Sequence, residues 1–246
     1  MNDTLRAQLK SLHLNNLLAH WDEAVAQAAE QRWSHERFLT HLIEQEYRFK
    51  QERARQLRRH CAHIPEPWVI ETFPFAQQPK LNQKKIMALY DSSSYLQNRQ
   101  NIIWLGGTGC GKTGLATSFL IHALDLGYRG RYVLFADLIA QFYRSAADHS
   151  EQKVLKGYLA WDILLIDEIG YVDVEPAQVG LFFTLMHQRH KRKPTLITSN
   201  LGFDEWKSFL KNEHLSAALL DRLSENSHVM NMRGCVSLRP KMSLDT

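Results

Sequence analysis

Eight consecutive residues near the middle of the chain have the types and spacing of a phosphate-binding loop. They are Gly106, Gly107, Thr108, Gly109, Cys110, Gly111, Lys112 and Thr113, which match the pattern G-x-x-x-x-G-K-[ST]. Glycines let backbone N–H groups approach a polyphosphate closely, and the lysine reaches the outer phosphates. The hydroxyl of Thr113 is a ligand for Mg²⁺. The loop therefore predicts a site for a nucleoside triphosphate and Mg²⁺.

Two acids and an amide follow apolar runs further along the chain. Asp167 and Glu168 come directly after residues 163–166, and Asn200 closes the run that begins at Thr195. Because open parallel sheets bind ligands at the carboxyl ends of their strands, we expect Asp167 to orient Mg²⁺ and Glu168 to position and deprotonate the attacking water. Asn200 would help to hold that water beside the terminal phosphate. The acids could instead cap the next helix, and an asparagine there could serve only a turn.

The elements that must position these side chains can be read from the hydrophobic pattern. Short apolar runs at residues 101–105, 131–135, 163–166 and 195–198 alternate with helical stretches. Strands buried on both faces have such continuous apolar runs. The pattern predicts an α/β domain with a parallel sheet that carries helices on both faces.

The first part of the chain has a different character. Residues 5–60 have a helical pattern, in which Ser34 is the expected N-cap of a second helix, and Pro65 and Pro67 end it. Residues 65–99 contain further prolines and a serine cluster, with one short helix expected over residues 82–90. We predict a helical N-terminal domain at 1–64 for DNA or partner binding, a connector at 65–99 and a nucleotide-binding domain at 100–246.

Basic residues form two clusters. The first comprises Arg53, Arg55, Arg58 and Arg59, and the second comprises Arg189, Lys191, Arg192 and Lys193. Each cluster is typical of a solvated helix face, and each could equally make sequence-independent contacts with the phosphates of duplex DNA. The net charge of +4 is compatible with an anionic partner but too small to identify one.

Composition excludes several classes of protein. No apolar stretch among the 246 residues approaches the roughly 20 residues of a membrane span, and the N-terminus lacks the apolar region of a signal peptide. We therefore expect no membrane partner and a cytoplasmic location. Three scattered cysteines argue against a disulfide framework, and the twelve histidines lack the spacing of a zinc site.

The order of these motifs resembles that of AAA+ ATPases of the DnaC and IstB type. Residues 164–170, 195–201 and 219–223 more closely resemble IstB, the ATPase helper of insertion-sequence transposases, and the resemblance covers nearly the whole chain. It implies an AAA+ P-loop domain with a parallel central sheet after a small all-helical domain. It also implies ATP and Mg²⁺ as cofactors, and DNA-stimulated hydrolysis. The implied function is assistance to a transposase in target DNA capture and strand transfer.

The same resemblance implies that Arg222 is an arginine finger, which reaches the ATP of a neighbouring subunit in a homo-oligomer. From its own surroundings in the sequence, Arg222 could equally pair with Asp221 or Glu225. The chain departs from the family pattern at Cys110, where Thr or Ser is common. It also lacks the usual Ser-Tyr-Arg near residues 233–239, which leaves a sensor 2 role for Arg239 open. The alternatives are a DnaC-like replicative helicase loader and a DNA-binding scaffold in which ATP is structural.

Overall fold

The computed structural model describes residues 1–239, which fall into two compact units, one from Met1 to Leu57 and one that begins at Arg58. This division lies a few residues before the expected end of the helical domain at residue 64. No helix among the described residues is long and apolar enough to cross a membrane.

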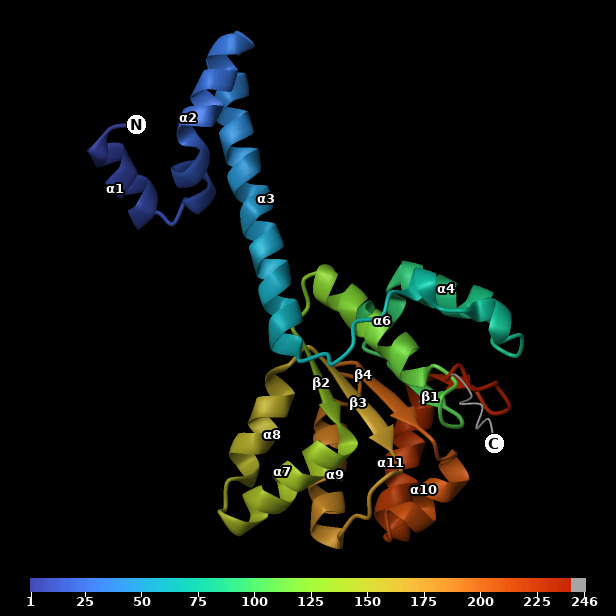
Figure 1. Ribbon diagram of the computed structural model, residues 1–246. Coiled ribbons are helices and arrows are strands. Elements are labelled where there is room, and N and C mark those ends of the chain that lie inside the picture. Colours follow the sequence, from blue (N-terminus) through green and yellow to red (C-terminus); the bar gives the residue numbers. More distant parts are fainter. Residues whose placement is uncertain (240–246) are drawn as a thin grey trace, which may run out of the picture. The chain divides into compact units, whose positions relative to one another are not determined.

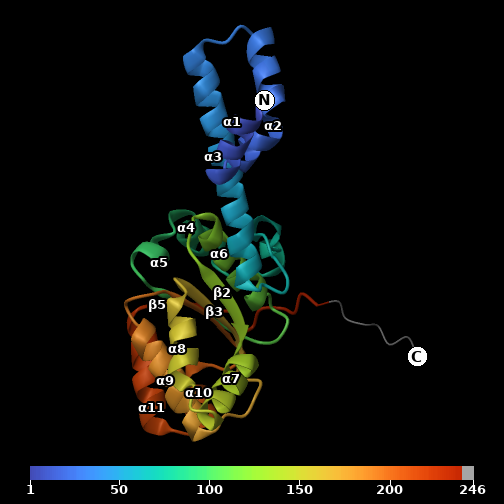
Figure 2. The same cartoon turned by 90° about the vertical axis from the view of Figure 1, so that its left-hand side faces the viewer.

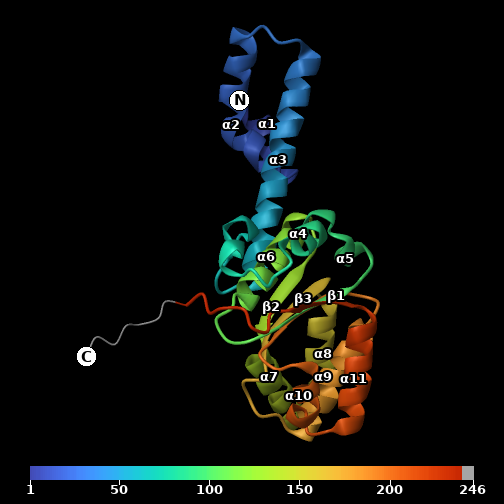
Figure 3. The same ribbon diagram turned by 90° about the vertical axis from the view of Figure 1, so that its right-hand side faces the viewer.

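The first unit consists of helices, as the sequence predicts. It contains α1 (Asp3–Ser11), α2 (Asn15–Glu30) and most of α3 (His35–Ala62), and Figures 1 and 3 show α2 beside α3. The predicted N-cap is confirmed, because the hydroxyl of Ser34 accepts a hydrogen bond of 3.2 Å from the N–H of Arg37. The two long helices pack through the rings of Trp21 and Phe38, whose centroids are 6.4 Å apart.

The second unit is built on a five-stranded parallel sheet. Its strands are β1 (Asn101–Leu105), β2 (Gly130–Leu134), β3 (Ile163–Ile169), β4 (Thr195–Ser199) and β5 (Ser227–Asn231), in the order β2-β3-β4-β1-β5. The four strands expected from apolar runs are confirmed. The sequence did not predict β5, because this edge strand reads Ser-His-Val-Met-Asn and only Met230 is buried.

Helices cover both faces of the sheet, which confirms the predicted α/β class (Figures 1 and 2). One face carries α4 (Gln83–Ser92), α5 (Ser94–Gln97) and α6 (Lys112–Asp125), with the short 3₁₀ turns η1 (Ile70–Thr72) and η2 (Phe75–Gln77). The other face carries α7 (Phe135–Ala147), α8 (Glu151–Ala160), α9 (Pro176–Arg189), α10 (Phe203–Phe209) and α11 (Glu213–Glu225). Each face has its own hydrophobic core.

The segment expected to be a connector is packed into the second unit. Ile70, Phe73 and Ile86 are buried in the core beneath α6. The ring of Trp68 lies so close to α6 that a Cβ added at Gly114 would come within 2.9 Å of it. Residues 65–99 therefore form part of the wall of the nucleotide-binding domain rather than a free linker.

Arg189 joins helices to the amino ends of the strands. Its side chain is 1% exposed, and it donates hydrogen bonds to the carbonyls of Tyr158, Trp161 and Pro194 at 3.2, 3.0 and 2.7 Å. Its Nε also donates to the hydroxyl of Thr195 at 3.0 Å. One buried guanidinium thus donates to acceptors in α8, in the turn before β3 and at the start of β4. The planar guanidinium of arginine carries five N–H donors and suits such a set of acceptors better than the ammonium of lysine would.

We expect Arg189→Met to lower the free energy of unfolding by about 2–4 kcal/mol, because two buried carbonyls and one part-buried carbonyl lose their donor. Urea denaturation followed by circular dichroism measures the change. Arg192→Ala is the matched control, since Arg192 is exposed and should change stability by less than about 0.5 kcal/mol. Equal stabilities of the two variants would contradict this role for Arg189.

Candidate nucleotide-binding site

The phosphate-binding loop joins β1 to α6 and borders a cavity of ≈ 440 Å³. Gly109 and Gly111 have φ angles of 79° and 95°, which side chains other than glycine rarely adopt. Gly106 has no room for a side chain, because an added Cβ would lie 2.8 Å from the backbone of Met232. The glycine spacing is therefore required by the fold of this loop as well as by a ligand.

Lys112 lies at the first position of α6 and curls back over the loop. Its Nζ donates hydrogen bonds of 2.7 Å to the carbonyls of Gly106 and Gly107, so these carbonyls hold the ammonium within the loop. Burial lowers the pKa of Lys112. The ammonium lines the cavity, where the oxygens of a polyphosphate would be stronger acceptors than backbone carbonyls.

The carboxylate of Asp167 receives hydroxyl hydrogen bonds from three elements. Thr113 on α6 donates at 3.1 Å, Tyr132 on β2 donates at 2.9 Å, and Thr198 on β4 donates a third bond. Asp167 is 1% exposed, and burial raises the pKa of the Tyr132 hydroxyl beside it. This arrangement fixes the carboxylate next to the hydroxyl of Thr113.

These oxygens fit Mg²⁺, which prefers hard ligands and keeps much of its shell for water and phosphate oxygens. Thr113 and Asp167 both line the cavity and are the residues that would hold the ion together with the phosphates of a nucleotide. Within residues 1–239, no group of three or more His, Cys, Asp or Glu side chains could hold a metal. A partial protein site of this kind suits an ion that arrives with a nucleotide.

Glu168 is aimed at the cavity by an unusual backbone. Its φ is 63°, and the pairing of β3 with β4 shifts register between Ile166 and Ile169. The N–H of Glu168 donates to the hydroxyl of Thr198 at 2.9 Å, which secures the bulge. The exposed carboxylate consequently lines the cavity beside the buried Asp167 instead of pointing away from it.

Asn200 and Arg222 are not among the residues that line the cavity. The side-chain oxygen of Asn200 is buried without a hydrogen-bond partner among residues 1–239 and lies against Gly170, where an added Cβ would come within 2.2 Å of it. Arg222 donates to the carbonyl of Ala218 at 2.8 Å and lies 5.2 Å from the centre of the Phe183 ring. The alternative, a pairing of Arg222 with Asp221 or Glu225, is absent from the contacts of the described residues.

Several residues that line the cavity belong to no sequence motif and were not predicted as site residues, namely Glu66, Trp68, Tyr132, Tyr171, Thr198 and Leu238. Arg239 lines the cavity too. Gln78 links the phosphate-binding loop to the C-terminal segment of the unit. Its side-chain amide donates to the carbonyl of Cys110 in the loop at 3.3 Å and to the carbonyl of Val236 at 2.7 Å. No local signal marks such residues, because only the folded chain brings them to the loop.

The basic clusters are mostly engaged within the protein. Arg59 forms two hydrogen bonds with Asp125 at 2.9 and 2.6 Å, and Arg58 donates to the carbonyl of Leu124 at 2.8 Å. Arg55 lies 3.5 Å from Glu52, whereas Arg53 is exposed on the same helix.

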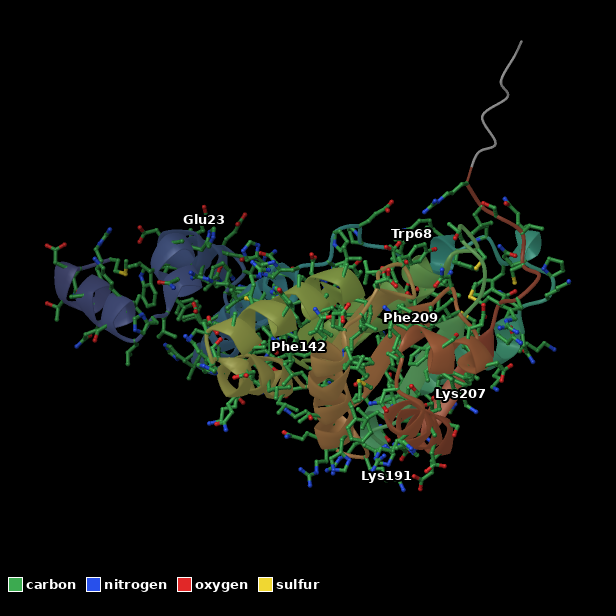
Figure 4. All side chains as sticks on the ribbon, turned by 90° about the horizontal axis from the view of Figure 1, so that it is seen from below. Glu23, Trp68, Phe142, Lys191, Lys207 and Phe209 are labelled. Atoms are coloured by element: carbon green, nitrogen blue, oxygen red, sulfur yellow. The ribbon has the colours of Figure 1, made fainter. Side chains whose placement is uncertain are left out.

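In the second cluster, Arg189 was predicted to contact DNA, and this is wrong because its side chain is buried among carbonyls. Lys191 pairs with Glu225, Lys193 donates to the carbonyl of Leu159 at 2.6 Å, and Arg192 is exposed. Lys191 lies apart from Trp68, which borders the cavity (Figure 4).

A parallel sheet in this order, with a phosphate-binding loop after β1 and acids at the end of β3, defines a P-loop nucleotide-binding domain of the AAA+ class. Solved structures agree with that fold. The chain is similar to DnaA from Aquifex aeolicus bound to AMPPCP, with a TM-score of 0.56 and 18% identity over 69% of this chain and 51% of that one. It is also similar to DnaI, with a TM-score of 0.53 and 16% identity over 61% and 85%.

The chain belongs to the family of IstB-like ATP binding proteins, whose family model matches residues 7–245. It is 30% identical to the ATP-binding protein of insertion sequence IS5376 from Geobacillus stearothermophilus, over 95% of this chain and 93% of that one. It is 29% identical to the ATP-binding protein of insertion sequence IS21 from Pseudomonas aeruginosa, over 94% and 86%. The predicted family is thus confirmed, and ATP is the nucleotide of this family.

We expect Gly106→Ala to abolish ATP binding, because the new methyl group would clash with the backbone of Met232 and displace the loop. Gly107→Ala is the matched control, since nothing lies within 4 Å of a Cβ added there. Its affinity should stay within about threefold of wild type, a difference of less than 1 kcal/mol. Calorimetric titration with Mg²⁺ and ATP measures both, and equal losses would contradict the steric explanation.

Proposed function

We propose that this protein is a Mg²⁺-dependent, DNA-stimulated ATPase that binds duplex DNA and assists a transposase in target capture and strand transfer during insertion-sequence transposition. One observation carries the proposal: the insertion-sequence family match spans residues 7–245 and includes an intact nucleotide site. In that site, Lys112, Asp167 and Glu168 line one cavity. With DNA as its partner, the protein would work in the cytoplasm.

The residues of the cavity would have separate roles in ATP hydrolysis. Lys112 would leave the loop carbonyls to bind the outer phosphates, and the loop N–H groups would bind the remaining oxygens. Thr113 and Asp167 would hold Mg²⁺, which supplies charge neutralisation at the phosphates. Glu168 is an exposed carboxylate that lines the cavity directly after Asp167, and it would position and deprotonate the attacking water.

Asn200 has a role in this proposal only after a local change. Its buried oxygen has no hydrogen-bond partner in the described part of the chain and faces Gly170, and the residue does not line the cavity. An unpaired buried oxygen is costly, so a conformation that gives it a partner is favoured when one is offered. We propose that nucleotide binding allows the Asn200 carboxamide to turn toward the cavity and hold the water.

Arg222 is not among the residues that line the nucleotide cavity of its own chain. Arg222 lies on α11, and its guanidinium contacts only the Ala218 carbonyl and the Phe183 ring among the contacts described. We propose that the protein forms homo-oligomers in which Arg222 reaches the ATP of the neighbouring subunit and neutralises charge on the terminal phosphoryl group. ATP binding would then favour assembly of the oligomer, and ATP hydrolysis would favour its dissociation.

DNA contacts are proposed for the basic residues of the two clusters whose side chains are exposed or half-buried and can reach the surface. Arg53 and Arg192 have exposed side chains, and Arg55, Arg59, Lys191 and Lys193 form intramolecular bonds near the surface that phosphates could replace. The helical first unit would contribute Arg53 and Arg55 to DNA or partner binding. Contacts of this type are independent of sequence and weaken steeply with salt.

A replicative helicase loader is the second candidate. The chain is similar to the DnaC helicase loader with a TM-score of 0.50, but the identity is 22% and the likeness concerns the fold alone. The insertion-sequence relatives cover both units of the chain, which favours the transposition helper. A transposase reading frame adjacent to the gene would support the helper, whereas a replication operon would support the loader.

We expect Glu168→Gln to bind ATP with near wild-type affinity and to hydrolyse it about 100-fold or more slowly, because the amide cannot accept the proton of the attacking water. The variant should also stay on duplex DNA after ATP is added, which a gel-shift assay can follow. Asp173→Asn is the control, since its exposed carboxylate lies nearby but outside the cavity. Normal ATP turnover by Glu168→Gln would refute the assignment of the base.

Arg222→Ala should lower ATP hydrolysis about 10³-fold if the guanidinium acts on the terminal phosphoryl group. Mixing tests whether it acts between subunits. Lys112→Ala subunits lack a working site but keep Arg222, so their addition to Arg222→Ala subunits should restore phosphate release. Failure to restore activity in oligomers shown to contain both variants would contradict the intersubunit site.

A further inference from the structure

The side-chain hydroxyls of Thr108 and Tyr171 meet at the nucleotide cavity. The hydroxyl of Tyr171 lies 2.8 Å from that of Thr108, and both residues line the cavity. Tyr171 follows the end of β3, whereas Thr108 belongs to the phosphate-binding loop. Both side chains are exposed, Tyr171 at 48%, so their hydrogen bond adds little to the stability of the fold.

The position of Tyr171 places it at the phosphate end of the cavity. It comes three residues after Glu168 and four after Asp167, whose carboxylates line the same cavity. Its partner Thr108 lies in the loop whose Gly106 and Gly107 carbonyls hold the Lys112 ammonium. The Tyr171 hydroxyl is thus an additional neutral donor beside the groups that would bind the outer phosphates.

The backbone that carries Tyr171 is tied to the cavity and to Asn200. Glu168 and Gly170 have φ angles of 63° and 111°, so the chain turns sharply just before Tyr171. Gly170 packs directly on the unpaired Asn200 oxygen. A displacement of Tyr171 would therefore act on both Glu168 and Asn200.

We propose that Tyr171 is a positioning residue that distinguishes ATP from ADP. Without a terminal phosphoryl group, its hydroxyl stays paired with Thr108. With ATP bound, Tyr171 leaves Thr108 and donates to an oxygen of the terminal phosphoryl group, since a charged oxygen is a stronger acceptor than a hydroxyl. The movement draws Gly170 away from Asn200 and frees the carboxamide to turn.

This inference rests on the proposed nucleotide site, and it predicts opposite effects for the two partners of one hydrogen bond. Tyr171→Phe removes the donor and should weaken binding of a non-hydrolysable imido analogue of ATP about tenfold, while ADP changes by less than about twofold. Thr108→Val removes only the competing resting partner and should tighten binding of the analogue about threefold.

Calorimetric titration of the full chain with each nucleotide and Mg²⁺ measures these affinities without any turnover. A thermal melt of each variant verifies folding, which the exposure of both side chains should preserve. Equal weakening of ADP and the analogue in Tyr171→Phe, no change in either, or weaker analogue binding in Thr108→Val would overturn the inference. Failure of the wild-type protein to bind the analogue would instead refute the proposed nucleotide site.

Discussion

The structure of the site depends on one buried carboxylate. Asp167 accepts hydroxyl hydrogen bonds from α6, β2 and β4, so the phosphate-binding loop, the sheet and the acid pair are held in one arrangement. The hydroxyl of Thr198 also accepts from the N–H of Glu168 and thereby stabilises the left-handed backbone there. A buried charge is tolerated only when it is well hydrogen-bonded, which explains why three hydroxyls surround it.

The phosphate-binding loop is also enclosed by segments far away in the sequence. Gln78 holds the carbonyl of Cys110 and pairs with both backbone groups of Val236, and the N–H of Leu238 donates to the carbonyl of Gly109 at 2.9 Å. Because Trp68 and Arg239 line the same cavity, a bound nucleotide would contact both segments.

Charge patterns proved the least reliable part of the sequence interpretation. Arg189, Lys191, Arg192 and Lys193 read as one basic cluster, yet Arg189 is buried, Lys191 and Lys193 are bonded within the protein, and Arg192 is exposed. Three of the four described partners of Arg189 are backbone carbonyls, which every residue type carries, so no residue pattern marks them. Strand β5 was missed for a related reason, since its half-exposed edge position needs no apolar run.

The sequence by itself determined the phosphate-binding loop, the two acids that lie near the end of β3, four of the five described strands and the family. These features depend on local constraints: glycine at positive φ, apolar residues along buried strands, and fixed residue types next to phosphate and Mg²⁺. Only the tertiary structure decided that Trp68, Thr198 and Tyr171 border the cavity, and that Asn200 and Arg222 do not. Those relations join residues that are distant along the chain, and packing rather than local pattern brings them together or keeps them apart.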